Sequence, residues 1–477
     1  MNKSEKLSYI FHLLVGTARC AVPARVQRAE RMGHVHAHVP RLNGAETAQR
    51  AVPTNSGFRN RLSFACLAVY FAAAVWAFGD SSSFEFTVAA GERERNQVPV
   101  RVLMPRGPIG KDRIASVTLA GPDGKSIPAQ WTGPGLTSIA AGELHFVLPH
   151  LAAGESVRLK ATLSTESPSS RRGFTWRDQP GHHTDLMFGE RKIVTYHYER
   201  LDESTPGSRV RTYKVFHHVF SPKGDRIVTG GLNEDPKVHS PHHRGIFYGF
   251  NRIAYGDGKR ADTWHCIDGA FQQHERFLAS EEGPVLGRHR VDISWHGKDA
   301  AFAEEERELT VYNVPGGHLI EFASRLRSPS GRVRIDGDPQ HAGFQFRAHN
   351  DVDAYTTNQT IFVRPDGIGK PAETRNWDPQ TRKGPVNLPW NAMSFVLGNK
   401  RYTVAYLDHP GNPKEARFSE REYGRFGSYF EYTIEKDKPL TVNYRLWLQE
   451  GLMKPEEAAA LSNDFVDPVQ VTVHVPE

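Results

Sequence analysis

Histidines are concentrated between residues 238 and 274, in a segment that begins VHSPHHRGIFYGFNRI and ends DTWHCIDGAFQQH. Five of the 23 histidines of the chain lie in this segment, together with arginines, aspartates and a tryptophan. The imidazole side chain has an ordinary pKa of about 6.5, so histidine can both accept and donate a proton near neutral pH. This density of imidazoles predicts a functional site.

Four histidines are the candidate catalytic groups: His242, His243, His265 and His341. His242 and His243 are adjacent, and neighbouring side chains of an extended strand point to opposite sides. We therefore expect only one of these two residues to face the site. The hypothesis is that this histidine and His265 transfer protons at a sugar carbon or a glycosidic oxygen, and that His341 assists.

Polar and aromatic residues beside these histidines could bind the substrate. The planar guanidinium group of Arg244 suits a carboxylate, although the same group could instead hold loop carbonyls together. Asp262 supplies an acid, and Trp264 could either stack on the apolar face of a sugar ring or pack in the core. We treat these three residues as candidate substrate-binding groups.

The segment 341–349, HAGFQFRAH, alternates between polar and apolar residues. Phe344 and Phe346 fall on one face of the predicted strand, where they can pack. The opposite face carries His341, Gln345, Arg347 and His349. This face is either an ordinary solvated surface or the lining of a cleft, and Gly343 favours the cleft because it would let a ligand approach the backbone. These polar residues are therefore candidates for substrate binding.

A loop with two prolines and a glycine, DHPGNP at 408–413, precedes a second run of polar and aromatic residues. The candidates for substrate binding in this region are His409, Arg417, Tyr423 and Arg425. Loops on a rigid sheet often carry function, so this region could close over the same cleft. Its arginines and glutamates could equally form a network that braces the loop.

Metal binding is an alternative role for the histidines, because zinc and iron sites need several converging histidine or carboxylate ligands. The candidates are His239, His243, His265, His274 and His341. The sequence has no HExxH motif, so we assign no residue as a metal ligand. The sequence itself requires no cofactor, and a bound metal stays an open alternative. For proton transfer, the run Glu304–Glu306 could supply a complementary base if one carboxylate faces inward.

The charge of the chain is unevenly distributed. The formal net charge is +6, but residues 1–61 contain ten Lys and Arg and three Glu, so this extension carries +7 and the remainder −1. A nearly neutral remainder does not form a broad surface for nucleic acid, and we predict no nucleic-acid partner. We interpret residues 1–61 as a disordered basic extension or as the product of a mistaken start site.

Residues 62–79 include the only long apolar run, LSFACLAVYFAAAVWAF. The run is short for a membrane span, and Val75-Trp76-Ala77 resembles the small-residue pattern that precedes a signal-peptidase cut. We interpret this segment as a signal peptide or, alternatively, as a single N-terminal anchor. Either interpretation places the folded part outside the cytoplasm. Beyond this segment Cys266 is the only cysteine, so no internal disulfide can form there.

The rest of the sequence is dominated by short alternating segments that are typical of strands. Residues 84–163 predict a small β-sandwich accessory domain with regularly spaced turns, and the polar segment 164–172 predicts a linker. Residues 173–477 again have strand patterns apart from a short helical run at 455–462, and they contain neither a dinucleotide-binding glycine motif nor a P-loop. We predict an all-β protein in which a large antiparallel β-sandwich carries the site.

Several motifs resemble those of the PmoA-like family of bacterial secreted proteins, whose function is unresolved. The motifs are PHHRGIFYGF, ADTWH, DHPxNP, EYGRFGSYF and YRLWLQEG, in this order. The resemblance runs from about Phe84 to Leu461. The family label suggests methane oxygenase, but a membrane subunit of that enzyme would need several spans and this chain has at most one. The strand pattern is also similar to galactose-mutarotase-like supersandwiches, which implies an association with carbohydrate.

These observations lead to one principal functional prediction and two alternatives. We predict a periplasmic or secreted carbohydrate-active enzyme, either a lyase, a hydrolase or an epimerase. It would act on a sugar or a uronate-containing glycan through histidine acid–base chemistry. The alternatives are a glycan-binding protein without activity and a metal-dependent oxygenase or hydrolase with histidine ligands. The predicted partner is a carbohydrate, with no membrane association beyond an N-terminal anchor.

Overall fold

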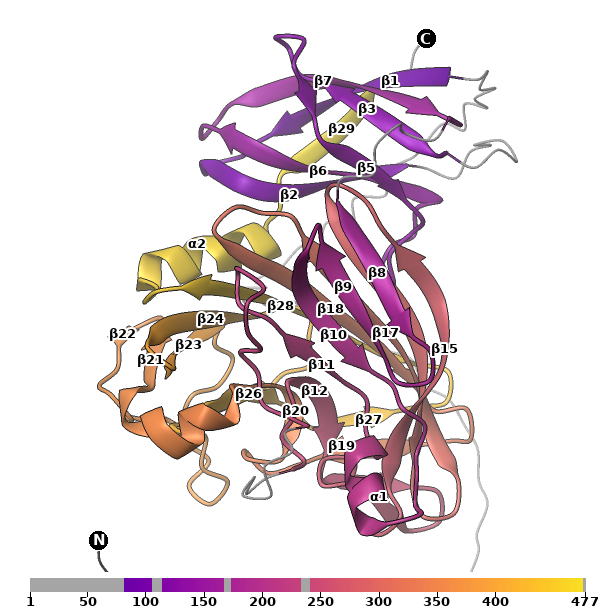
Figure 1. Ribbon diagram of the computed structural model, residues 1–477, viewed down its shortest axis with the longest axis vertical. Helices are drawn as coiled ribbons and strands as arrows, with labels where there is room; N and C mark the ends of the chain where they lie inside the picture. The colour runs from indigo at the N-terminus through magenta and orange to yellow at the C-terminus, as the bar shows by residue number, and fades with distance from the viewer. Residues whose placement is uncertain (1–80, 105–113, 167–172, 233–240, 475–477) are drawn as a thin grey trace, which may run out of the picture. The chain divides into compact units, whose positions relative to one another are not determined.

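Figure 1 shows the computed structural model of the chain, in which the strands of the described residues form several sheets. The structure describes residues 81–104, 114–166, 173–232 and 241–474. The predictions for residues 1–61 and 62–79, for His239 and for most of the 164–172 linker lie outside these ranges. Within the described ranges, no helix is long and apolar enough to cross a membrane.

The first β-sandwich consists of a five-stranded and a three-stranded sheet that enclose one hydrophobic core. The strand orders are β29-β1-β7-β3-β4 and β2-β6-β5. The strands are β1 Ser81–Ala89, β2 Arg95–Met104, β3 Ser116–Ala120, β4 Ser126–Ile127, β5 Ala129–Thr132, β6 Gly142–Leu151, β7 Ser156–Ser164 and β29 Gln470–His474. Val98, Val100 and Val102 of β2 are buried because alternate side chains of a strand face the opposite sheet.

The C-terminal strand β29 belongs to this first sandwich. Val471 lies opposite Val88 of β1 in an antiparallel register. This pairing corrects the extent expected for the large sandwich, which had included residues 470–474. The alternating valines 469, 471 and 473 pack against the first core. Such a pattern suits an edge strand of either sandwich, so it could not by itself assign β29.

The second β-sandwich is larger and consists of an eight-stranded and a nine-stranded sheet. The eight-stranded sheet contains, in order, β25 Arg417–Arg421, β26 Arg425–Tyr429, β20 Ala342–Arg347, β12 Ile246–Phe250, β11 Phe216–Val219, β10 Arg191–His197, β9 His183–Phe188 and β8 Phe174–Gln179. The nine-stranded sheet contains β15 Phe271–Glu281, β16 Leu286–His296, β17 Ala301–Tyr312, β18 Gly317–Arg327, β28 Leu440–Glu450, β24 Lys400–Asp408, β23 Trp390–Leu397, β21 Ile361–Arg364 and β22 Gly367–Ile368.

A four-stranded sheet and a few short helices complete the second part. The sheet contains β14 Lys259–Ala261, β13 Arg252–Tyr255, β19 Val333–Asp336 and β27 Tyr432–Ile434. The helices are α1 Pro206–Thr212, the π-helix η1 Val352–Thr356, the 3-10 helix η2 Thr357–Gln359 and α2 Pro455–Val466. Strands far outnumber helices among the described residues, and the sheets are antiparallel. The prediction of an all-β antiparallel sandwich is confirmed.

The two large sheets pack against each other through aromatic and aliphatic side chains. The ring of Phe344 on β20 lies 4.3 Å from that of Phe322 on β18 and 4.7 Å from that of Tyr444 on β28. Because side chains alternate along a strand, Gln345 and Arg347 of β20 face the other side of the eight-stranded sheet. This other side, here called the outer face, carries the candidate site.

The inward-facing carboxylate of the run Glu304–Glu306 is Glu305, which is buried between the two large sheets. Its oxygens accept hydrogen bonds from the Arg307 guanidinium group, at 2.8 Å, and from the Trp295 indole nitrogen, at 2.8 Å. Glu305 is therefore a structural anion in the core. The idea that this run supplies a catalytic base is wrong.

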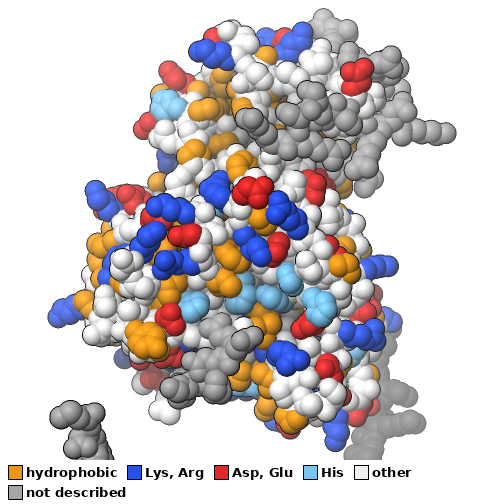
Figure 2. All heavy atoms as spheres, viewed as in Figure 1, with side chains coloured by type: hydrophobic (Ala, Val, Ile, Leu, Met, Phe, Trp, Pro, Cys, Tyr) orange, Lys and Arg blue, Asp and Glu red, His pale blue; other side chains and the backbone are white. Residues whose placement is uncertain are grey.

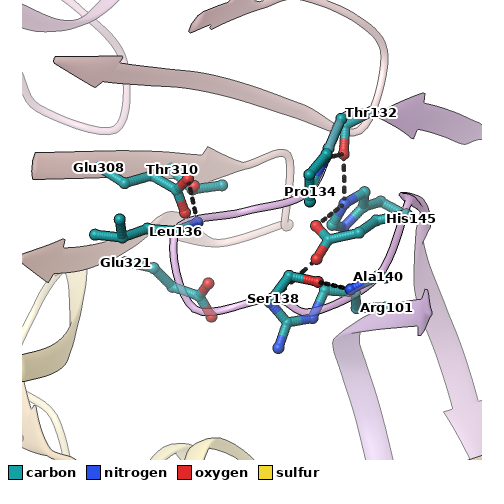
Figure 3. A network of polar contacts seen from close by, with 12 residues as sticks. Arg101, Thr132, Pro134, Leu136, Ser138, Ala140, His145, Glu308, Thr310 and Glu321 are labelled. Carbon is teal, nitrogen blue, oxygen red and sulfur yellow. Dashed lines mark hydrogen bonds and ion pairs between the residues drawn. The ribbon is translucent and has the colours of Figure 1, made fainter. Parts of the chain in front are cut away.

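A buried polar network joins the first sandwich to the second (Figure 3). The Glu308 carboxylate accepts a hydrogen bond from the main-chain nitrogen of Leu136, at 2.9 Å, and Glu143 lies 3.4 Å from the Arg288 guanidinium group. Burial alone would raise the pKa of Glu143, but the hydrogen bond with His145 and the charges of nearby arginines outweigh burial and lower it to about 2. Glu143 is therefore ionised at neutral pH, and its ion pair links the two sandwiches.

Glu281, at the end of β15, lies beside this network. Its pKa is raised, whereas that of Glu143 is lowered. Burial raises the pKa of Glu281 to about 7, with Glu308 and Glu143 adding to the rise and Arg288 opposing it. Between the ordinary pKa of 4.5 and about 7 the folded protein holds a proton that the unfolded chain has lost. The contribution of Glu281 to the free energy of unfolding therefore decreases as pH rises through this window, and it stays constant at higher pH.

We expect the Glu281→Gln variant to lose this part of the pH dependence, because its amide does not titrate. Urea unfolding at about pH 5 and about pH 8 measures the change relative to the unmodified protein. Glu190→Gln is a matched control, because Glu190 has a side chain that is almost fully exposed. If the stability of Glu281→Gln and that of the unmodified protein depended on pH in the same way, Glu281 would not be the group responsible.

Candidate metal centre

Four imidazole rings meet on the outer face of the eight-stranded sheet. They come from three separate segments: the loop before β12, the turn after β14 and the turn before β20. The ring centroids of His242 and His243 lie 4.3 Å apart, those of His242 and His265 4.6 Å, and those of His265 and His341 4.7 Å. The structure thus brings together the four candidate catalytic histidines. We call these four residues the histidine cluster.

The expectation that only one of the two adjacent histidines can face the site is wrong. Residues 241–245 form a turn and not a strand, so strict alternation does not apply to them. Gly245 has a positive φ of 48°, and a Cβ atom there would lie 1.9 Å from the main-chain oxygen of His217. Only glycine fits this contact, which holds the turn against β11.

Arg244 fastens this turn and does not face the site. Its side chain is buried, and its guanidinium group donates hydrogen bonds to the main-chain oxygens of Pro241, at 2.8 Å, of Arg211, at 3.0 Å, and of Val210. The same group lies 4.4 Å from the centre of the Tyr213 ring. The structure therefore favours the loop-bracing role of Arg244 over substrate binding.

The turn after β14 is organised by Asp262. One carboxylate oxygen accepts hydrogen bonds from the main-chain nitrogens of Trp264 and His265, at 2.9 and 2.7 Å. The other oxygen lies 2.7 Å from Nδ1 of His265. Asp262 thus orients His265. Trp264 is 0% exposed and packs on the Phe247 ring at 4.6 Å, so it cannot act as a platform for a sugar ring.

His341 has the same arrangement. Its Nδ1 lies 2.9 Å from one carboxylate oxygen of Asp338, and the other oxygen of this carboxylate accepts a hydrogen bond from the Asn251 side chain at 2.7 Å. Burial would raise the pKa of Asp338, but the hydrogen bond and charge of His341 outweigh burial and lower it. An ionised aspartate at Nδ1 holds the proton there, so that Nε2 carries the lone pair. Carboxylates commonly orient metal-binding histidines in this way.

Three of the four histidines present a possible set of metal ligands. His242, His243 and His341 each offer one ring nitrogen, and these three atoms lie within 4.8 Å of one another. Among the described residues, no other group of three histidine, cysteine or carboxylate side chains meets this condition. Zinc binds imidazole nitrogen at about 2.0 Å, which places tetrahedral ligands roughly 3.4 Å apart. A bound zinc ion would therefore require those ring nitrogens that are farther apart than this to move closer together.

His243 is the most unusual member of the cluster. The residue is 4% exposed, and neither ring nitrogen has a hydrogen-bond partner among the residues that the structure describes. A buried polar atom without a partner costs free energy, and a bound ion would satisfy it. Burial and the nearby charge of Arg425 hold the pKa of His243 well below its ordinary value, and burial with Lys214 lowers that of His242 to about 2. Both imidazoles are therefore neutral, which is the form that binds a metal ion.

The carboxylate behind His341 provides a test of this geometry. We expect the Asp338→Asn variant to bind zinc roughly 10- to 100-fold more weakly, because outer carboxylates orient the ligand and increase its basicity. Competition with a coloured zinc chelator measures the affinity. Asp351→Asn is the matched control, since Asp351 lies 3.6 Å from a histidine outside the cluster, His349. Equal losses in the two variants would contradict a specific role of Asp338.

The other predicted binding residues divide into two groups. Gln345, Arg347, Tyr423 and Arg425 lie beside the histidine cluster on the outer face, where Arg425 donates hydrogen bonds to Gln345 and Tyr423. His349, His409 and Arg417 have contacts elsewhere.

In this second group, Nδ1 of His349 accepts a hydrogen bond from the main chain of Asp351. His409 packs against the Phe465 ring of α2 at 5.3 Å. Arg417 pairs with Glu415 and Glu431, at 3.0 and 2.5 Å. These contacts correct the grouping of all three residues with the site, and those of Arg417 fit the alternative of a braced loop.

The sequence interpretation missed three residues of this region: Lys214, Asp338 and Arg421. Lys214 is buried and donates hydrogen bonds to the main-chain oxygens of His242 and Trp264, so it joins two loops of the site. Asp338 could have been found, because DTWH at 262–265 and DPQH at 338–341 share the spacing D-x-x-H. Arg421 lies in the polar and aromatic run after residues 408–413, although it was not among the candidates taken from that run, whereas Lys214 lies in no pattern that would have indicated its position.

Further histidines lie along the same outer face. Figure 2 shows histidine side chains near the middle of the face viewed. His183, His197 and His218 lie on β9, β10 and β11, and the neighbouring ring centroids are 5.6 and 5.1 Å apart. The ring of His197 stacks on Phe216 at 4.6 Å. This row does not form a second set of three close ligand atoms among the described residues.

Comparison with protein families identifies the group to which the chain is related. Residues 183–463, more than half of the chain, match the model of a family described as "Family of unknown function (DUF6807)". The chain belongs to the DUF6807 family. The matched range contains the whole histidine cluster of this DUF6807 protein. The family description assigns no activity, so the resemblance to PmoA-like proteins stays a prediction.

Solved structures with partial similarity to this DUF6807 protein include two from Enterococcus faecalis. An alpha-mannosidase matches with a TM-score of 0.41 and 10% identity, over 83% of this chain and 46% of that one. A protein of glycosyl hydrolase family 38 matches with 0.39 and 10%, over 83% and 48%. A GH36 alpha-galactosidase from Geobacillus stearothermophilus matches with 0.28 and 10%, over 58% and 41%. The chain thus spans less than half the length of each. Similarity at this level does not extend to activity, and comparison with curated proteins finds no match.

Proposed function

We propose that this DUF6807 protein is a metal-dependent enzyme whose ion is held by His242, His243 and His341. The convergence of three ring nitrogens within 4.8 Å is the observation that supports this most strongly. Two further observations add to it: His243 has no hydrogen-bond partner within the described ranges, and a carboxylate orients His341. Neutral imidazole ligands suit zinc, copper and nickel, and zinc is the ion to test first.

The donor set favours hydrolytic or Lewis-acid chemistry over an iron oxygenase. Iron oxygenases commonly use two histidines and one carboxylate as direct ligands. Here Asp338 bonds to the far ring nitrogen of its histidine, and Asp262 orients His265 beside the three ligands. A zinc ion held by three imidazoles lowers the pKa of a bound water to about 7.

His265 is the residue of the cluster best placed to transfer a proton. Its Nδ1 is held by Asp262 at 2.7 Å, so its Nε2 can accept a proton from a water molecule at the site. The ring lies 4.6 Å from that of His242 and 4.7 Å from that of His341. The sequence analysis had considered four histidines for acid–base chemistry. The proposal keeps this role for His265 and makes the other three metal ligands.

A glycan remains the proposed substrate class, and a location outside the cytoplasm remains the proposed compartment. The apolar run at 62–78 and the sequence resemblance to secreted proteins support the compartment. The buried positions of Trp264 and Arg244 remove two arguments for sugar binding. The remaining site residues are compatible with a lyase, a hydrolase or an epimerase. Analysis of the reaction products is needed to distinguish these three activities. A glycan-binding protein without activity would bind sugar but turn over none of it.

Elemental analysis tests the proposal directly. The protein is purified without a histidine tag and without added metal salts, and its metal content is measured by plasma mass spectrometry. We expect about one zinc or another late transition-metal ion per chain. A screen of oligosaccharides, with and without a chelator, then tests whether the ion is needed for turnover. A protein that neither retains nor takes up a stoichiometric ion would overturn the proposal and return the histidines to metal-free proton transfer.

A further inference from the structure

Three arginines form a row across adjacent strands beside the histidine cluster. Arg347 of β20 lies directly opposite Arg425 of β26, and Arg425 lies directly opposite Arg421 of β25. Directly opposite residues of antiparallel strands point to the same side of a sheet, so the three side chains share the outer face. Like charges in this position destabilise a sheet unless an anion compensates them. We call these residues the arginine row.

Few carboxylates of the described residues pair with these arginines. Burial lowers the pKa of Arg421, and the nearby charges of Glu422 and Asp338 act against this larger effect. Arg347 has one carboxylate partner, Asp353 at 3.2 Å. Arg425 is buried, and its hydrogen-bond acceptors are neutral: the Gln345 amide oxygen at 3.0 Å, the Tyr423 hydroxyl at 3.2 Å and the Ser419 hydroxyl at 3.4 Å.

Arg421 is also without a carboxylate partner. It is half-buried and donates one hydrogen bond, to its neighbour's main-chain oxygen at 3.3 Å. Within the described part of the chain, neither Arg425 nor Arg421 has a carboxylate within 4.0 Å. The carboxylate of Glu420, next to Arg421 in sequence, is bound instead by Arg364 at 2.6 Å.

The arginine row adjoins the candidate metal centre. The Tyr423 ring lies 6.1 Å from the His243 ring, and the Arg347 guanidinium group lies 4.8 Å from the centre of the Tyr423 ring. The Arg425 guanidinium group lies 5.8 Å from the centre of the Trp264 ring, which itself lies 5.7 Å from His243. Arg347 and Arg425 are buried, whereas Arg421 is partly open to solvent. The row therefore leads from the buried side of the histidine cluster toward solvent.

We infer that the site binds an anionic group of its substrate, a carboxylate or a phosphate, with Arg421 in direct contact and Arg425 and Arg347 as its buried support. The planar guanidinium group suits both anions, because it can donate two parallel hydrogen bonds to them. A metal ion at the three histidines would add positive charge and strengthen this preference. The inference rests on the proposed function for the location of the reacting centre. The arginine row itself does not depend on a metal ion.

Ligand-observed NMR, which detects weak binding, tests the inference with three small probes. D-Glucuronate carries a carboxylate on a sugar ring, D-glucose has the same ring without the charge, and inorganic phosphate carries the charge without the ring. Each probe is titrated into zinc-loaded protein and into protein treated with a chelator. We expect glucuronate, phosphate or both to bind more tightly than glucose in both preparations. The comparison of the two anions identifies which one the site prefers.

The Arg421→Gln variant should weaken binding of the preferred anion about tenfold or more, because a hydrogen bond to a charged group contributes about that much. Arg177→Gln is the matched control. Arg177 is on β8, at the far edge of the same sheet, opposite Asp185 of β9, and its side chain is 56% exposed. Thermal unfolding of both variants verifies that the fold is kept. We expect the Arg177→Gln variant to bind like the unmodified protein.

The outcomes separate this inference from the proposed function. Anion binding that depends on Arg421 in a protein unable to hold zinc would support the inference and contradict the metal centre. Zinc binding without a preference for either anion over glucose would contradict the inference and leave the metal centre intact. Equal weakening in Arg421→Gln and Arg177→Gln would also overturn it, since a general effect of surface charge would then explain the result.

Discussion

The His243→Ala variant is expected to lose its metal ion while it keeps its fold. His243 is buried, and in the described part of the chain neither ring nitrogen has a hydrogen-bond partner, so the substitution breaks no hydrogen bond that the structure shows. Removing a direct ligand should weaken binding by more than the roughly 10- to 100-fold expected when an outer carboxylate is removed. Elemental analysis of the purified variant and zinc titration with a chelator measure the effect.

The histidine His409 offers a matched control for this experiment. It was grouped with the site by sequence, but it packs against Phe465 and not in the histidine cluster. His409→Ala should therefore keep the metal content of the unmodified protein. If His243→Ala is too unstable to purify, His341→Ala tests the same set from a half-buried position. Unchanged metal content in the ligand variants would show that the three histidines do not hold the ion.

A second large effect is expected at the buried ion pair in the core of the large sandwich. The Glu305→Ala variant should lower the free energy of unfolding by about 3–5 kcal/mol, because it leaves the Arg307 charge buried without its partner. The Trp295 indole nitrogen would lose its acceptor at the same time. Urea unfolding followed by circular dichroism measures the loss.

Two further variants make this test specific. Glu304→Ala removes the neighbouring carboxylate, which is exposed, and should change stability by no more than about 0.5 kcal/mol. The double variant Glu305→Leu with Arg307→Met replaces both charges by apolar groups and should recover most of the loss. If the Glu305→Ala variant were as stable as the unmodified protein, the ion pair would contribute nothing to the free energy of unfolding. That result would contradict the prediction.

The tertiary structure changed the roles of individual residues more than it changed the location of the site. Trp264 and Arg244 were expected at the substrate, but one packs beneath the cluster and the other fastens a turn. Burial decides between these roles, and local sequence contains no measure of how many neighbours a side chain will have. Asp338 lies at the site because its turn precedes β20, and Arg421 lies there because it is opposite Arg425 in the β25–β26 register. Both positions depend on how the strands pair.

The sequence alone determined the all-β class, because period-two alternation is a local property of each strand. It also located the histidine-rich segment, and the D-x-x-H spacing that recurs at 262–265 and 338–341 was present in the sequence. Only the tertiary structure decided that the ring nitrogens of His242, His243 and His341 lie within 4.8 Å of one another and that three arginines line up beside them. It also placed β29 in the first sandwich. These features depend on which strands pair and in which register, and pairing between distant segments leaves no signal in either segment by itself.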